Sequence, residues 1–167
     1  MDAMIRAILL RIIGREERRL GQSLDYVRFI VRASLRAFRA FSRIFGIAAY
    51  RRRLPPDPLN IARIVAVRRE DCGTCLQVAI NIARREGLPA EAIRAAVAGA
   101  AHGLPDDLAL VLRFADGEEA LRDDLRRRFG DEGLVEIALA IASARFFPSV
   151  KRTLGYATSC ARVTLEI

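Results

Sequence analysis

The chain has 167 residues, carries a net charge of +8 and is 52% apolar, so it has the length of a single domain with a substantial core. Its three cysteines, an odd number, argue against the disulfide framework of a small secreted protein. Arginine interrupts the apolar runs and no small-residue cleavage site follows Ile13, so the sequence predicts neither a transmembrane helix nor a secretory signal.

The positive charge is concentrated in the first third of the chain. Residues 1–53 contain 13 arginines and 4 acidic residues, a net charge of +9, whereas residues 54–167 have a net charge of −1. Met1–Gly14 is amphipathic at helical spacing, and Ser23 is a suitable N-cap for a long helix that runs to about Phe45. We interpret residues 1–53 as a basic helical arm in front of a helical core formed by residues 54–167.

One face of the predicted long helix carries arginines at intervals of three and four residues: Arg28, Arg32, Arg36, Arg39 and Arg43. This stripe is either a solvated face on a helix that packs by its apolar side, against another subunit included, or a helix lying on an anionic membrane surface. The charge would also permit non-specific contact with nucleic acid, but no recognition motif is present, so we expect no specific nucleic-acid partner. We expect a cytoplasmic protein, or one held peripherally at the inner membrane surface.

Proline and glycine divide the remaining sequence into helices, and no convincing strand appears. Pro55, Pro56 and Pro58 separate the arm from a helix that begins near Leu59 and is apolar on most faces, so it should be buried. The fold class is therefore predicted to be all-α. The helices expected after it are 72–86, with Asp71 as its N-cap, then 89–101, 105–115, 116–129, 135–147, which Pro148 ends or kinks, and 149–162.

The chemistry of the chain is concentrated in Cys72-Gly73-Thr74-Cys75, at the start of a predicted helix. A helix N-terminus stabilises a thiolate, and a spacing of three residues brings the two sulfurs to one face, close enough to form a disulfide. Val78 and Ala79 continue an apolar line from Cys75. We therefore expect Cys75 to point inward and Cys72 to lie nearer to solvent.

Several other polar residues are candidates for a role beside the thiols. Glu70, which adjoins the first cysteine, is a candidate local base. Gln77 and Asn81 lie one turn apart and either line a pocket beside the sulfurs or form ordinary amide hydrogen bonds. His102, the only histidine, is a surface loop residue unless the fold carries it to the cysteines. Cys160 is either a buried small apolar residue or a third redox thiol.

The stretch from about Pro56 to about Gly155 resembles the carboxymuconolactone decarboxylase superfamily, and within it the AhpD-like alkylhydroperoxidases. The resemblance rests on the cysteine pair at a helix start, on the continuation 83–87 (Ala-Arg-Arg-Glu-Gly), and on segments 112–115 and 133–147. It implies an AhpD-like all-α fold assembled into trimers, hexamers or other oligomers. It also implies that the cysteine pair reduces a peroxide or disulfide substrate and that an external thiol reductant restores it. We expect no cofactor, and the scattered cysteines and histidine do not have the spacing of a metal site.

Two positions depart from the family's motif. The family has a relay His four residues after the second cysteine and a relay Glu twelve residues before the first, and this chain has Ala79 and Asn60 there. General acid–base help is worth roughly 10²–10⁴-fold, so the resemblance implies a weak peroxidase or a thiol–disulfide oxidoreductase. The family attacks with its second cysteine, which is Cys75 here, but without the His its partner Cys72 is an equal candidate.

Two other functions remain open from the sequence. The same fold could serve as a non-catalytic oligomeric binding or scaffold module, which residues 1–53 would attach to a membrane surface or to a partner. A decarboxylase acting on a small lactone is the third hypothesis, although no specific residues for that chemistry are found.

Overall fold

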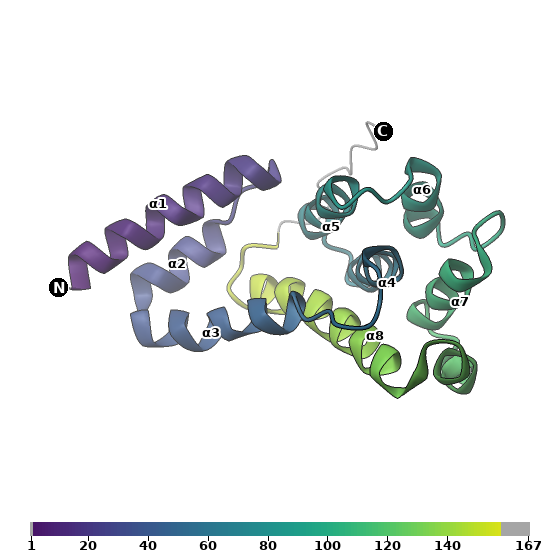
Figure 1. Cartoon of the computed structure of the whole chain (residues 1–167). Coiled ribbons are helices and arrows are strands. Elements are labelled where there is room, and N and C mark those ends of the chain that lie inside the picture. The colour runs from purple at the N-terminus through teal and green to yellow at the C-terminus, as the bar shows by residue number, and fades with distance from the viewer. Residues whose placement is uncertain (1, 158–167) are drawn as a thin grey trace.

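The computed structural model describes residues 2–157, and within that range the chain forms eight α-helices, one short 3-10 helix and no strand. The predicted all-α fold class is confirmed. In Figure 1 the first three helices lie to one side, and the other helices surround α4. The elements are α1 (Asp2–Leu20), α2 (Asp25–Ala33), α3 (Leu35–Ala48), α4 (Pro56–Arg68), α5 (Gly73–Arg85), α6 (Ala90–Ala98), α7 (Asp106–Ala115), η1 (Glu119–Leu121) and α8 (Arg122–Thr153).

The helix α4 is the centre of the core, as its apolar composition predicts. It contacts α5, α6, α7 and α8, and residues such as Leu59, Ile61 and Ile64 have no exposed surface. Proline occupies the first turn of α4, where a missing N–H costs no helical hydrogen bond. Burial of this apolar helix on all sides is what holds the four surrounding helices together.

A second apolar cluster joins the first three helices to the C-terminal end of α8. Its buried members come from α1, α2 and α3, and Phe146 and Phe147 of α8 pack against it. Phe41 is the centre of the cluster, because its ring contacts those of Tyr26, Phe38, Phe45, Phe146 and Phe147. Within residues 2–53 the three helices are therefore packed on the rest of the chain through this cluster.

The connection between α3 and α4 is fixed by one buried carboxylate. Glu136 of α8 is 1% exposed and accepts hydrogen bonds from the backbone N–H groups of Arg52, Arg53 and Leu54, at 2.5, 2.7 and 3.0 Å. Burial opposes ionisation of Glu136, but the three N–H donors outweigh it and lower the pKa of this carboxyl group.

The predicted long helix from Ser23 to Phe45 is wrong, because Ser34 divides it. Ser34 is extended (φ −159°, ψ 120°), and its hydroxyl caps α3 by accepting the Ala37 N–H at 3.1 Å. Arg6 of α1 donates hydrogen bonds to carbonyl groups in the last turn of α2. The end of α2 and the start of α3 therefore both have side-chain hydrogen bonds to their backbone. Ser23 is not the N-cap either, because α2 begins at Asp25.

The C-terminal helices agree with the prediction in part. The break expected after residue 129 is present, because Gly130 is non-helical (φ 74°, ψ 176°) and a kink there divides α8 into two helical segments. The first segment begins only at Arg122, after η1, and the second continues through Pro148 to Thr153. By length and composition the described stretch Glu119–Thr153 could cross a membrane, which differs from the sequence-based expectation; in this fold its apolar face packs on α4 and α3. Residues 158–167, Cys160 and the end of the last predicted helix among them, lie outside the described residues.

Candidate thiol site

The two cysteines lie at the N-terminus of α5, as predicted, but the details of the helix start differ. Cys72 itself occupies the N-cap position, with extended backbone (φ −120°, ψ 91°), and its carbonyl accepts the Leu76 N–H at 2.9 Å. Asp71, the expected cap, has a positive φ of 49° and an exposed side chain. The sulfurs are therefore at the positive end of the α5 dipole, which favours a thiolate.

The two sulfurs face each other as free thiols. Cys72 Sγ and Cys75 Sγ are 2.9 Å apart, and the Thr74 hydroxyl lies 3.7 Å from Cys72 Sγ. Their exposure is the reverse of our prediction: Cys72 is buried, at 5% exposure, and Cys75 is partly exposed. The apolar line that begins at Cys75 does face the neighbouring helices, but the packing there leaves a cleft rather than a closed core.

Lys151 is the functional candidate that sequence reasoning missed. It is 8% exposed, and its ammonium group donates a hydrogen bond to the Thr74 hydroxyl across 77 positions of sequence. The sequence could have drawn attention to it, because Lys151 is the only lysine in a chain that has 27 arginines. Lysines are rarely buried without a partner, so an ammonium group held beside two thiols points to an electrostatic role.

The surroundings shift the pKa values of the two thiols in opposite directions. The hydrogen bond between the two sulfurs is the main cause that lowers the pKa of Cys72 to about 5, against the opposing effect of burial, and Thr74 and Lys151 also favour the thiolate. The same hydrogen bond, together with burial and the nearby negative charge, raises the pKa of Cys75 well above its ordinary value. At neutral pH the pair therefore holds one proton between two sulfurs.

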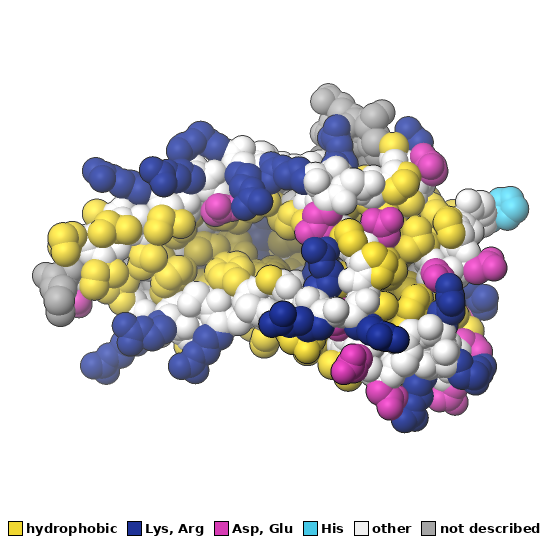
Figure 2. Space-filling model, in the orientation of Figure 1, with side chains coloured by type: hydrophobic (Ala, Val, Ile, Leu, Met, Phe, Trp, Pro, Cys, Tyr) yellow, Lys and Arg dark blue, Asp and Glu magenta, His cyan; other side chains and the backbone are white. Residues whose placement is uncertain are grey.

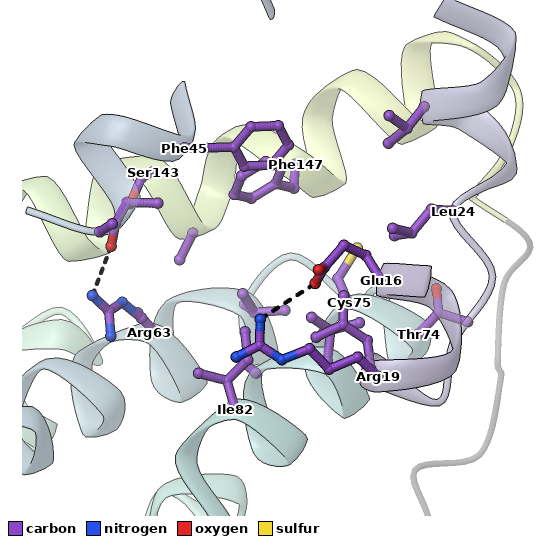
Figure 3. A pocket seen from close by; sticks show the side chains of 18 of the residues that line it. Glu16, Arg19, Leu24, Phe45, Arg63, Thr74, Cys75, Ile82, Ser143 and Phe147 are labelled. Carbon is purple, nitrogen blue, oxygen red and sulfur yellow. Dashed lines mark hydrogen bonds and ion pairs between the residues drawn. The ribbon is translucent and has the colours of Figure 1, made fainter. Parts of the chain in front are cut away.

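Cys75 opens into a cleft of about 870 Å³ between the first three helices and the core. In Figure 2 apolar side chains line the hollow and basic side chains lie along its margins. Figure 3 shows Cys75 and Thr74 near one end of the cleft, Arg63 toward the other, and the rings of Phe45 and Phe147 between them. Those two rings are stacked, with centroids 5.8 Å apart. A substrate in this cleft would meet Cys75 and not the buried Cys72.

The predicted auxiliary residues next to the motif have structural partners instead. Glu70 forms an ion pair with Arg152 (3.7 Å), and the carbonyl of Glu70 accepts a hydrogen bond from the same side chain. Gln77 donates to the Asn81 amide oxygen at 3.0 Å, and Asn81 donates to the Leu20 carbonyl at 2.7 Å. Gln77 and Asn81 are not among the residues that line the cleft; Asn81 joins α5 to the end of α1.

The remaining candidates divide between the cleft and the surface. Ala79, at the position of the family's relay His, lines the cleft one turn beyond Cys75. Asn60, at the position of the relay Glu, is buried and hydrogen-bonded to Glu86 and Arg63 at 2.8 and 3.1 Å. His102 is exposed in the loop between α6 and α7 and does not line the cleft. Within residues 2–157 no group of three or more His, Cys, Asp or Glu could hold a metal ion.

Comparison of the chain with protein-family models, with curated proteins and with solved structures gave no match. Its functional interpretation therefore depends on the geometry of the thiol site and on the sequence motif.

Proposed function

We propose that the protein is a thiol redox enzyme that reduces a hydroperoxide or a disulfide with Cys75 and Cys72, in the manner of the AhpD-like proteins that its motif resembles. The observation that carries the proposal is a pair of free sulfurs 2.9 Å apart at a helix N-terminus, one of which opens into a cleft. Proximity of this kind lets the first oxidised sulfur be attacked by the second without a large movement.

In the proposed reaction Cys75 attacks and Cys72 resolves. The proton that the two sulfurs share moves from Cys75 to Cys72, which leaves a thiolate on the sulfur that substrate can reach. That thiolate forms a bond to the terminal peroxide oxygen as the O–O bond breaks, and the departing alkoxide takes the proton from Cys72 to become an alcohol. The Cys72 thiolate then attacks the Cys75 sulfenic acid, forming the disulfide and releasing hydroxide, which a solvent proton converts to water.

The overall step consumes two thiols and one hydroperoxide, and produces one disulfide, one alcohol and one water. An external dithiol must then return two electrons and two protons to the pair. In this reaction Lys151 replaces part of the electrostatic effect that a relay His has in the AhpD-like proteins. It places a positive charge beside the thiolate and beside the departing alkoxide oxygen.

Single-cysteine variants test the assignment. Cys72→Ser should still form a sulfenic acid on Cys75 that dimedone traps, most readily at alkaline pH. In Cys75→Ser the remaining cysteine of the pair, Cys72, should be modified far more slowly because its sulfur is buried. The wild-type protein should lose two thiols per peroxide consumed. Equal dimedone labelling of both variants would overturn the choice of Cys75, and unchanged thiol content after peroxide treatment would overturn the redox function.

A second function is favoured by the surface of α1. Met4, Ile5 and Ile8 are exposed, at 64%, 38% and 50%, on a helix that also carries several arginines. Apolar and basic side chains together on an exposed helix suit a binding module that docks on an anionic membrane surface or assembles with further copies of the chain.

The two attachments are distinguished in the full-length chain. Ile5→Ser/Ile8→Ser should reduce co-sedimentation with phosphatidylglycerol vesicles if α1 binds membranes, and should reduce the sedimentation coefficient if α1 joins subunits. Val135→Ser is the matched control, because Val135 is equally exposed but lies on α8. A protein whose vesicle binding and oligomeric state are both unaffected by the α1 variant would exclude this second function.

A further inference from the structure

The floor of the cleft is one face of α5, with a thiol at one end and charges at the other. Cys75, Val78 and Ile82 follow each other at helical spacing along the cleft, and Arg85 and Glu86 complete the row. At 1.5 Å per residue the eleven steps from Cys75 to Glu86 span about 16 Å. The cleft is therefore long enough for an extended molecule whose two ends meet different chemistry.

The walls between these ends are apolar. Phe45 and Phe147 stack over the middle of the cleft, and Ile13, Val27 and Phe38 contribute from the first three helices. Such walls favour a hydrocarbon chain, since they offer few hydrogen bonds and gain free energy by excluding water.

The cleft has an excess of positive charge. Among the described residues that line it, the cations are Arg19, Arg51, Arg63, Arg85 and Lys151, and the carboxylates are Glu16 and Glu86. Glu16 pairs with Arg19 at 3.5 Å and Glu86 pairs with Arg51 at 3.9 Å, which leaves a net charge of +3. An anion inside the cleft would balance charge that the protein leaves unbalanced.

Two of these arginines, Arg63 and Arg85, are candidates to bind an anionic group. Arg63 donates to Asn60 and to the Ala48 carbonyl (2.7 Å), and within the described residues neither Arg63 nor Arg85 has a carboxylate at ion-pair distance. Burial lowers the pKa of Arg63, so this guanidinium group is less stable as a cation than one in water. A ligand carboxylate would stabilise it and could accept two parallel hydrogen bonds.

We propose that the cleft binds a single long acyl chain with an anionic head group, the head at Arg63 and Arg85 and the chain running along α5 toward Cys75. The substrate of the redox site is then a long-chain fatty acid hydroperoxide, whose mid-chain peroxide reaches Cys75 while its carboxylate remains at the arginines. The binding of the chain is independent of the proposed redox function, whereas the identity of the peroxide rests on it.

The test measures binding without any redox step, in Cys72→Ser/Cys75→Ser protein. Palmitate should displace a fluorescent fatty acid from the cleft, and methyl palmitate, which has no charge, should bind at least about tenfold more weakly, or about 1.4 kcal/mol. Arg63→Gln and Arg85→Gln should each weaken palmitate several-fold. Arg84→Gln should not, because Arg84 adjoins Arg85 on α5 but does not line the cleft.

A variant that fills the cleft keeps the proposal falsifiable if an arginine variant fails to fold. Ala79→Phe adds a ring to the floor of the cleft and should abolish palmitate binding while circular dichroism stays unchanged. Equal affinity for palmitate and its methyl ester, or palmitate binding that survives Ala79→Phe, would overturn the proposal. If the double variant binds palmitate but wild-type protein that loses thiols to other peroxides does not reduce a long-chain fatty acid hydroperoxide, the substrate assignment would be overturned and the binding of the acyl chain would stand.

Discussion

The ammonium group of Lys151 donates a hydrogen bond to the Thr74 hydroxyl, the same oxygen that lies 3.7 Å from Cys72 Sγ. A residue near the end of α8 is thus linked to the first turn of α5 and through it to the thiol pair. The contact provides a buried positive charge beside the thiol pair.

Replacing this lysine should weaken the thiolate. Lys151→Met removes the positive charge beside the pair, so we expect the pKa of Cys72 to rise above about 5 and alkylation at acidic pH to slow. Ultraviolet absorbance of the thiolate, followed against pH, measures the change directly. Lys151→Arg keeps the charge and should have a smaller effect; a titration curve that is the same for Met and wild type would rule out the electrostatic role.

The hydrogen bond between the sulfurs should matter more than the lysine. Cys75→Ala removes the main cause that lowers the pKa of Cys72, so its titration should move from about 5 toward the ordinary value for cysteine, roughly 8.5. Thr74→Val removes a weaker donor and should produce a smaller shift in the same direction. Retention of a pKa near 5 in Cys75→Ala would assign the acidity to the helix terminus and Lys151 instead.

The buried carboxylate of Glu136 should make stability depend on pH. Its pKa is lowered in the folded state, so its contribution is fully present above the ordinary value for Glu, roughly 4.3, and is lost as the pH falls through the folded-state pKa. At neutral pH Glu136→Gln should cost about 1–3 kcal/mol, because an amide offers its own N–H groups to backbone donors.

Urea unfolding at several pH values provides the measurement. The stability difference between Glu136→Gln and wild type should shrink as the pH falls below about 4. Glu132→Gln is the matched control, since Glu132 is an exposed acid one turn earlier on the same helix. If the loss of unfolding free energy in Glu136→Gln does not change with pH, ionisation of Glu136 is not the cause of that loss.

The aromatic cluster should hold the first three helices on the core. Phe41 is 8% exposed and contacts five other rings, so Phe41→Ala should cost about 3–5 kcal/mol. Phe29 is 44% exposed and its ring contacts only that of Tyr156 among the described residues, so Phe29→Ala should cost far less. Thermal melting of the two variants compares them; similar losses would show that the cluster is not the main attachment.

Local sequence signals predicted the helices of the core well. Pro89 and Pro105 mark the starts of α6 and α7, because a proline at the N-cap and an acid in the first turn suit a helix N-terminus wherever the helix packs. The start of α4 was expected near Leu59, and the helix begins three residues earlier, at Pro56. The breaks inside long helical patterns were not predictable in the same way. Ser34 ends a helix whose apolar spacing continues, since the surrounding helices decide where the chain must turn.

The sequence by itself determined the helical fold class and the presence of a Cys-x-x-Cys pair at a helix start, since helical periodicity, turn residues and a three-residue spacing are local properties. Only the tertiary structure decided that Cys75 and not Cys72 opens into a cleft, that Lys151 lies beside the pair, and that Asn81 joins α5 to α1. Periodicity shows which residues share a face of a helix, but not which distant helix covers that face or leaves it open. For α5, the covering helices are α1, α2, α3 and α8. They surround its thiol end and leave the cleft between them.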